Sequence, residues 1–409
     1  MITNNAAEKP IIYLDNNATT RIDPRVLGVM IPYLDQYYGN PSSIHRLGAK
    51  VGQALEIARE QVQQFIGARF SSEIVFTSCA TEATSTAIMS AVEAYPDRKE
   101  IITTQVEHPA TLTLCQNLER KGYKIHFIGV DKKGRLDFKA FEAALSRNVC
   151  LVTMMWANNE TGTIFPIERV SHLAKFYGAL MHVDGVQAAG KIPMDVKSLH
   201  IDMMSISGHK FHAPKGVGAL YLRRGTRFRP LLRGGHQERG RRAGTENAAS
   251  IIAMGAAAQY AFNALETEVP RIQMLRDRLE QGLLARIPNS FVTGNRAHRV
   301  PNTCNLAVEY VEGEALLLMM NQEGIAASSG SACTSGSLEP SHVMKAMQIP
   351  FTAAHGTLRF SLSRFNTEED IDYVLEKLPP IVERLRELSP YWDNATNKGN
   401  VDAFAPVYA

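Results

Sequence analysis

The sequence predicts an α/β fold: a large domain built on a mostly parallel, mixed sheet, and a smaller α+β domain toward the C-terminus. Short apolar runs alternate with helical stretches and turn residues from about position 74 to position 222. Near position 266 the pattern changes to a charged helix followed by further strands and helices. Alternation of the first kind is typical of a parallel sheet with both faces covered by helices. A chain of 409 residues with 45% hydrophobic content can bury cores for two domains.

The elements follow from local periodicity. Apolar residues recur every three or four positions from Ile44 to Phe65, which predicts a long amphipathic helix ending near Gly67. The expected strands of the large domain are IVFT at 74, IITT at 101, IHFI at 125, CLVTMM at 150, ALMHVD at 179 and GALYL at 218. Beyond them we expect a helix from about Arg271, a strand at TCNLAVE, a helix at EGEALLLMMNQ and a strand at TLRFSLS.

These elements divide the chain into predicted units. We predict that residues 12–265 form the large domain. Residues 1–11 and 266–390 are predicted to form the small domain, which carries Cys333. Residues 391–409 form a polar tail. Thr367 and Asp370 predict a capping-box start for the last helix, which the proline pair at 379 and 380 should break or kink.

Composition excludes several classes of partner. The net charge of +3 is spread without blocks, so no basic stripe for nucleic acid is expected. No apolar run approaches the ~18 residues of a spanning helix, and the first ten residues lack a secretory signal, so we expect a soluble, cytoplasmic protein without a membrane partner. Five cysteines without paired spacing fit free thiols in a reducing compartment.

Lys210 is a candidate Schiff-base lysine. It follows a short apolar run and sits among small and hydroxyl residues in SISGHKFHAPKG, where its amine can be desolvated. Ser207 and His209 lie close enough in sequence to hold an anionic group beside it. The alternative reading is a surface loop lysine.

Asp184 and Gln187 follow an apolar strand in HVDGVQ, at the end where open α/β sheets bind ligands. A buried aspartate is expensive unless it meets a cation. The protonated pyridine nitrogen of pyridoxal phosphate is such a cation, and stabilising it makes that cofactor an electron sink. A helix-capping role for Asp184 is the alternative.

Two further strand ends carry candidate binding residues. Ala80 and Thr81 lie at a predicted helix start after IVFT, where free backbone N–H groups and a hydroxyl suit a phosphate. The alternative is an ordinary Thr cap, which uses the same geometry. His108 follows the next strand in EHPA and can stack on a planar ring or move a proton, although a lone histidine is more often structural.

Cys333 is the candidate reactive thiol. Its neighbours in ASSGSACTSGSLEPS are mostly serine, glycine and threonine, which predicts an exposed and mobile cysteine. Cys115, Cys150 and Cys304 lie in apolar settings and read as inert buried residues. Arg359 stands inside the strand TLRFSLS, where a bidentate clamp on a substrate carboxylate would account for it.

These segments together resemble the cysteine desulfurases of the nitrogen-fixation (NifS) type, a branch of the class-V aminotransferases among fold-type-I pyridoxal-phosphate enzymes. The motifs that carry the resemblance are YLDNNATT at 13, GNPSSIH at 39, ATE at 80, EHPA at 107, NNETG at 158, VDGVQAAGK at 183, SGHKFHAPKG at 207, RRAGTEN at 241 and SSGSACTSGSLEPS at 328. They run through most of the chain.

The resemblance implies a role for each matching position. Lys210 bonds covalently to the cofactor and later takes the substrate α-proton, Asp184 pairs with the ring nitrogen, Gln187 contacts the ring hydroxyl, and His108 stacks on the ring. The residues implied to hold the phosphate are Ala80, Thr81, Ser207, Gly208, His209 and, from the partner subunit of a homodimer, Thr245. Asn158 contacts cofactor or substrate, and Arg359 takes the substrate carboxylate.

The implied activity is removal of sulfur from L-cysteine, giving alanine and a persulfide on Cys333. The persulfide passes to an acceptor or iron–sulfur scaffold protein, in nitrogenase maturation or a housekeeping pathway, and Cys333 is also a possible transient iron–sulfur ligand. The alternatives are a selenocysteine lyase or aminotransferase on the same scaffold and a non-catalytic sulfur-trafficking protein. Cys79 and Ser85 depart from the expected glycine and asparagine, which affects the predicted phosphate turn.

Overall fold

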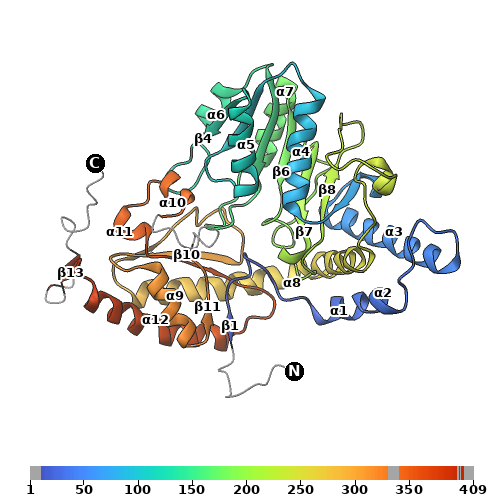
Figure 1. The fold of residues 1–409 in the computed structure, drawn as a ribbon. Coiled ribbons are helices and arrows are strands. Elements are labelled where there is room, and N and C mark those ends of the chain that lie inside the picture. Colours follow the sequence, from blue (N-terminus) through green and yellow to red (C-terminus); the bar gives the residue numbers. More distant parts are fainter. Residues whose placement is uncertain (1–10, 330–339, 394–395, 397, 400–409) are drawn as a thin grey trace.

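The computed structural model describes residues 11–329, 340–393, 396 and 398–399, and the described chain forms two packed parts joined by a long helix (Figure 1). The larger part holds a seven-stranded sheet in the order β2-β8-β7-β6-β5-β3-β4. Its strands are β2 (Ile74–Thr77), β3 (Glu100–Thr104), β4 (Lys124–Ile128), β5 (Val149–Met155), β6 (Leu180–Asp184), β7 (Met203–Ser207) and β8 (Gly218–Leu222). β8 runs antiparallel to β2 and β7, and the other neighbours pair in parallel. The predicted mostly parallel, mixed sheet is confirmed.

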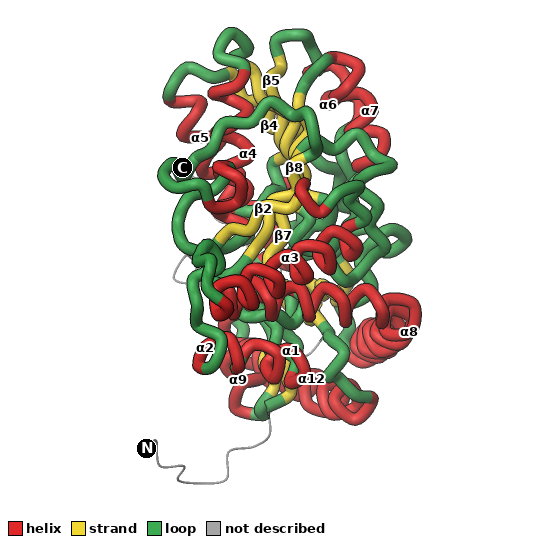
Figure 2. Tube along the Cα trace, turned by 90° about the vertical axis from the view of Figure 1, so that its right-hand side faces the viewer, coloured by secondary structure: helices red, strands yellow, loops and turns green. Residues whose placement is uncertain are grey.

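Helices cover both faces of this sheet. On one face lie α4 (Ala80–Ala94) and α5 (Pro109–Arg120), and their apolar residues share a core with alternate residues of the strands. The helices of the other face are α3 (Arg46–Ile66), α6 (Phe138–Ala144), α7 (Ile167–Tyr177) and the first half of α8 (Ala248–Arg286). In Figure 2, α4 and α5 lie to the left of the strands, and α6 and α7 lie to the right. The strands are therefore buried on both sides, as their continuous apolar runs require.

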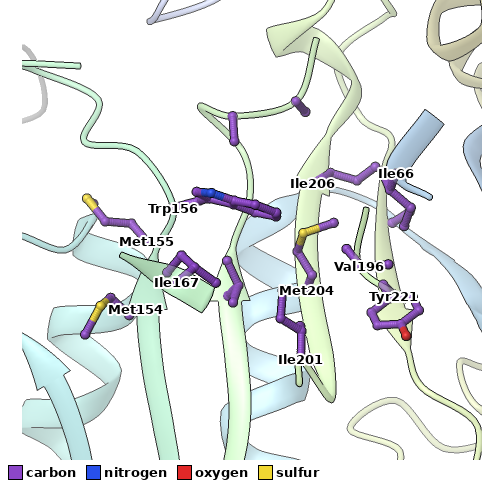
Figure 3. Packing of buried hydrophobic residues seen from close by; sticks show 14 of the residues in the cluster. Ile66, Met154, Met155, Trp156, Ile167, Val196, Ile201, Met204, Ile206 and Tyr221 are labelled. Carbon is purple, nitrogen blue, oxygen red and sulfur yellow. The ribbon is translucent and has the colours of Figure 1, made fainter. Parts of the chain in front are cut away.

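The larger core is densely packed where β5 and β7 meet the connecting loops. Trp156, Ile167 and Met204 are buried side by side there, and Tyr221 extends the same core toward the far strands (Figure 3). Close packing of these side chains holds the strands in place near their carboxyl ends.

The smaller part is an antiparallel sheet with its own core. The strands β9 (Ser290–Val292), β10 (Thr303–Val308) and β12 (Thr357–Ser361) pair antiparallel, and α9 (Gly313–Gln322) and α12 (Glu368–Leu388) pack against them. β1 (Ile12–Tyr13) pairs in parallel with β11 (Ile325–Ala326). The predicted large domain, residues 12–265, therefore includes β1, which pairs within the smaller part. The remaining short elements are α1 (Pro24–Met30), α2 (Pro32–Asp35), α10 (His342–Ala346), α11 (Phe351–Ala354), β13 (Trp392–Asp393) and β14 (Lys398–Gly399).

Two expected helix limits differ from the structure. The helix expected to begin near Arg271 is the second half of α8, which runs unbroken through Pro270 and contains the predicted domain boundary. α12 likewise continues through Pro379 and Pro380, so the helix is not broken there, and its capping box at Thr367 is present as predicted. A proline forfeits a helix hydrogen bond, but buried side chains on both sides of each proline hold these helices in their cores.

α8 also departs from the expectation that no segment could span a membrane. By length and composition it could cross one, but 61% of its most apolar window is buried inside the fold. That burial is typical of a core helix, since α8 packs against α3 and α12.

Candidate active site

A cavity of about 600 Å³ opens at the carboxyl ends of the parallel strands and is closed on one side by the smaller part. Nine of the residues selected from the sequence line it: Ala80, Thr81, His108, Asp184, Gln187, Ser207, His209, Lys210 and Arg359. All but Arg359 follow strand ends of the seven-stranded sheet, which parallel pairing brings to the same edge, and Arg359 comes from β12 of the smaller part. The structure therefore places these nine residues on one cavity, and the individual role of each stays a prediction.

Lys210 lies one turn beyond β7, in the short helix η2 (Gly208–Lys210). Its Nζ donates to the backbone oxygens of Asn17 (2.6 Å) and Ala18 (2.7 Å), which hold the amine at the cavity wall. Gly208 does not line the cavity; a Cβ there would lie 3.0 Å from the side chains of Ala213 and Val217. Its absent side chain therefore lets the lysine turn pack closely.

Asp184 and His108 face the cavity beside this amine. Burial raises the pKa of the Asp184 carboxyl, and the nearby charges of His108 and Lys210 act in the opposite direction. Burial lowers the pKa of His108, whose Nδ1 accepts the Ala110 N–H at 3.1 Å and caps α5. His108 can cap α5 and face the cavity at the same time, because the cap uses only one of its two ring nitrogens.

The start of α4 presents backbone donors to the cavity. The N-cap is Cys79, whose side chain makes no capping hydrogen bond, so the alternative of an ordinary Thr81 cap is wrong. Both Cys79 and Thr81 line the cavity, whereas Ser85 does not. The unsatisfied first-turn N–H groups and the helix dipole make this a natural anion site.

Gly218 shapes that turn, a role that was not predicted from the sequence. A Cβ at Gly218 would lie 2.7 Å from the backbone carbon of Cys79 and 2.8 Å from the Ile206 oxygen. Both atoms are backbone and cannot rotate away. β8 can therefore approach the α4 turn only with glycine at this position.

Gly218→Ala is expected to weaken binding of an anionic cofactor at least about tenfold and to destabilise the fold by ~1–3 kcal/mol, because overpacking pushes the Cys79 turn outward. Cofactor titration followed by absorbance, together with thermal unfolding, measures both effects. The matched control is Gly28→Ala in α1, where an added Cβ meets nothing within 4 Å. Equal behaviour of the two variants would contradict this role of Gly218.

Arg359 reaches the cavity from β12 of the smaller part. Its Nη1 donates to the Asn159 oxygen (3.1 Å), and its Nη2 donates to Asp15 Oδ1 (2.7 Å). Its Nε is buried and has no partner in the described part of the chain. The guanidinium is thus held in place while keeping N–H donors for a carboxylate.

The structure does not support the predicted contact of Asn158 with cofactor or substrate. Asn158 does not line the cavity; its Nδ2 donates to the Val106 oxygen at 3.1 Å and its Oδ1 accepts the N–H groups of Glu160 and Thr161. The next residue, Asn159, lines the cavity instead. Adjacent asparagines are indistinguishable by residue type, and only the turn geometry decides which faces the site.

Asn17 also belongs to the site, although the sequence indicated it only as part of the motif YLDNNATT. Its backbone oxygen accepts both Lys210 Nζ and Gln187 Nε2 (3.0 Å). Its side-chain Oδ1 accepts Lys191 Nζ at 3.2 Å, and Lys191 also donates to Gln187 Oε1 at 2.5 Å. Asn17 therefore connects the lysine turn to the residues that follow β6. An asparagine in a loop gives no periodic signal that could have revealed this.

Two buried carboxyl groups, Glu160 in the cavity lining and Glu107 next to the lining residue His108 in sequence, were not expected from the sequence. Burial raises the pKa of Glu107 to about 8 and that of Glu160 to about 7. Glu107 accepts from Thr104 Oγ1 at 2.7 Å and the Met155 N–H at 3.1 Å. Glutamates within loops read as surface residues, so only the tertiary structure reveals their burial.

Two predicted residues, Thr245 and Cys333, are not among the described residues that line the cavity. Thr245 is exposed and is not part of its own chain's cavity. Cys333 falls outside the described residues, so its roles as nucleophile and as iron–sulfur ligand stay predictions. Among the residues that the structure describes, no group of three or more His, Cys, Asp or Glu is placed to hold a metal. Burial raises the thiol pKa of the inert cysteines as expected: to about 12 for Cys115, about 11 for Cys150 and about 12 for Cys304.

Comparison with known proteins identifies the family. The model of the class-V aminotransferases matches residues 12–374. The chain belongs to the class-V aminotransferase family. Within this family it is 60% identical over 398 residues to "Cysteine desulfurase NifS" of Azotobacter vinelandii, covering 97% of this chain and 99% of that protein. It is 59% identical over 397 residues to a cysteine desulfurase of Klebsiella pneumoniae, with the same coverage.

Solved structures of class-V aminotransferase relatives share the fold. A NifS-like protein superposes with a TM-score of 0.86 at 38% identity, covering 92% of this chain and all of that one. The apo cysteine desulfurase of Thermococcus onnurineus NA1 gives 0.83 at 28% identity, covering 92% and 95%. SspA, solved in complex with cysteine, gives 0.74 at 31% identity, covering 87% and 99%. The predicted resemblance to NifS-type enzymes is confirmed.

Proposed function

We propose that this chain is a cysteine desulfurase that uses pyridoxal phosphate to move sulfur from L-cysteine to Cys333. The observation that carries the proposal is the convergence of Lys210, Asp184, the uncapped start of α4 and Arg359 on one cavity. The chain's 60% identity to a NifS cysteine desulfurase over nearly its full length supports it.

The residues present fit pyridoxal phosphate, which the family implies. The uncapped first turn of α4, with Ala80 and Thr81, suits the phosphate, and the half-buried Asp184 suits a protonated ring nitrogen. Lys210 would hold the cofactor covalently, His108 would lie against its ring, and Gln187 would contact the ring hydroxyl. When bound, this cofactor supplies a sink for the electrons of the substrate α-carbon.

The chain's own groups would then position L-cysteine and move its protons. Arg359 would donate its Nε–H and remaining guanidinium hydrogens to the substrate carboxylate, because Asn159 and Asp15 already orient it. Lys210 would take the α-proton, since its Nζ stands at the cavity wall. The cavity between the two parts would exclude bulk water from these steps.

Sulfur transfer balances without an added oxidant. The Cys333 thiolate attacks the substrate sulfur, an S–S bond forms, and the bond between that sulfur and the substrate Cβ breaks. The electron pair stays with carbon, which takes up a proton, so L-cysteine and a thiol become alanine and a persulfide. A reductant then releases sulfide, or an acceptor protein takes the sulfur.

The wider setting is part of the same proposal. Thr245 is exposed and does not line its own chain's cavity, which fits its contribution to the partner's site in a homodimer. The persulfide would pass to an iron–sulfur scaffold, in nitrogenase maturation as the NifS name of the relative suggests. We place the protein in the cytoplasm.

The test is a product assay on the purified protein with its cofactor. We expect L-cysteine plus a thiol reductant to give alanine and sulfide in equal amounts. Without reductant, we expect one sulfur to be retained per subunit, detected as a mass increase on the peptide that contains Cys333. An absolute requirement for a keto acid would indicate an aminotransferase, turnover restricted to selenocysteine would indicate a lyase, and absence of a chromophore and of turnover would indicate a trafficking protein.

A further inference from the structure

Glu160 stands at the junction between the cavity and the chain that follows Cys333. It lies in the loop after β5 and is 2% exposed. Its backbone is fixed on both sides, because its N–H donates to Asn158 Oδ1 (3.0 Å) and its oxygen accepts Asn305 Nδ2 (3.3 Å). The carboxyl group is therefore presented in one direction by a rigid loop.

That carboxyl group meets Ser341. The Ser341 Oγ lies 2.7 Å from Glu160 Oε1 and 2.6 Å from Oε2, and both side chains line the cavity. The same hydroxyl accepts the Val343 N–H at 3.1 Å, which makes Ser341 the N-cap of α10. The contact thus links a loop of the larger part to the first residues described after position 339.

A second hydrogen bond reinforces this attachment. The next residue, His342, donates from Nε2 to the backbone oxygen of Glu107 (2.9 Å), in the loop after β3. On the other side, Ser328 exchanges two backbone hydrogen bonds with Arg359 in β12, at 3.2 and 2.6 Å. The stretch carrying Cys333 is therefore attached to a strand of the smaller part at one end and to two cavity loops at the other.

The hydrogen bond between Glu160 and Ser341 can form whether the Glu160 carboxyl is ionised or protonated. Burial raises the pKa of Glu160 to about 7, with Ser341 and the charge of Arg359 acting against it. The ionised carboxylate accepts the Ser341 hydroxyl hydrogen, and the protonated acid can donate or accept at the same oxygen. Burying a carboxyl costs more than burying an apolar side chain of similar size, so packing alone does not account for Glu160.

We infer that Glu160 is a positioning residue for sulfur transfer: through Ser341 it fixes where the chain bearing Cys333 rejoins the cavity. This inference rests on the proposed function of Cys333. Glu160 need not touch the transferred sulfur, and its effect reaches the thiol through the backbone between Ser341 and Cys333.

The test compares Glu160→Ala, Ser341→Ala and the double variant of the cofactor-loaded protein. Each single change is expected to lower kcat about tenfold with less than about a twofold change in KM, and the double change to be no worse than the worse single change, because both remove one interaction. Glu160→Gln, whose amide oxygen still accepts the hydroxyl, should stay within about threefold of the native kcat.

A structural readout separates this anchor from general destabilisation and from failure of the proposed function. Amide hydrogen exchange of the peptide spanning α10 should rise at least about tenfold in Glu160→Ala and Ser341→Ala, while that of α12 stays unchanged. Unchanged exchange in α10, additive losses of kcat, or acceleration throughout the chain would overturn the inference. Activity retained by Cys333→Ser would instead overturn the proposed function, whatever α10 shows.

Discussion

Cys333→Ser is expected to abolish desulfuration, lowering the rate of alanine and sulfide release at least about 10³-fold, because it removes the nucleophile that forms the covalent intermediate. A serine hydroxyl is not ionised at neutral pH and does not form a stable bond to divalent sulfur. The cofactor absorbance should be unchanged, since the residues proposed to hold the cofactor lie on the strand ends of the larger part. Single-turnover assays of alanine, with mass spectrometry of the Cys333 peptide, measure the loss directly.

The control for this variant is Cys150→Ala. Cys150 is fully buried in β5, and burial raises its thiol pKa to about 11, so it is not a nucleophile at neutral pH. Its activity should remain within about twofold of the native value. Full activity in Cys333→Ser would make Cys333 a bystander and would favour the lyase or aminotransferase reading.

Lys210→Ala is expected to lower the rate by about 10³-fold or more, because it removes both the covalent attachment of the cofactor and the group placed to move the α-proton. The structure gives the reason for this dual dependence: the amine is held by the Asn17 and Ala18 oxygens at the wall shared with Asp184 and Arg359. Borohydride should fix the cofactor irreversibly to the native chain and should not do so in the variant, as read by absorbance after denaturation.

Lys215→Ala is the matched control for the lysine change. Lys215 is exposed and lies five positions beyond Lys210 in the same connection to β8, outside the cavity lining. Its removal should leave both the borohydride reaction and the turnover near native levels. If Lys215→Ala lost the covalent attachment and Lys210→Ala kept it, the assignment of Lys210 would be wrong.

The sheet, its covering helices and the residue types at the strand ends could be predicted from the residue pattern. Apolar runs report burial on both faces, and parallel strands bring their carboxyl ends together, so Asp184, His108 and Lys210 could be expected in one place. The burial of Cys115, Cys150 and Cys304 was also predictable, because each lies in an apolar run or on an apolar helix face. These features depend on local periodicity and on residue chemistry, which a single sequence displays.

The neighbours that complete the site become visible once distant segments of the chain are packed together. Asp15 meets Arg359 across 344 positions and Ser341 meets Glu160 across 181, so no local pattern reports either contact. The choice between Asn158 and Asn159 depended on one turn, and the continuity of α8 through Pro270 depended on packing at both of its ends. Contacts between distant segments, and the burial that shifts the pKa values of Glu107 and Glu160, arise from close packing of the whole chain, and residue order alone does not specify them.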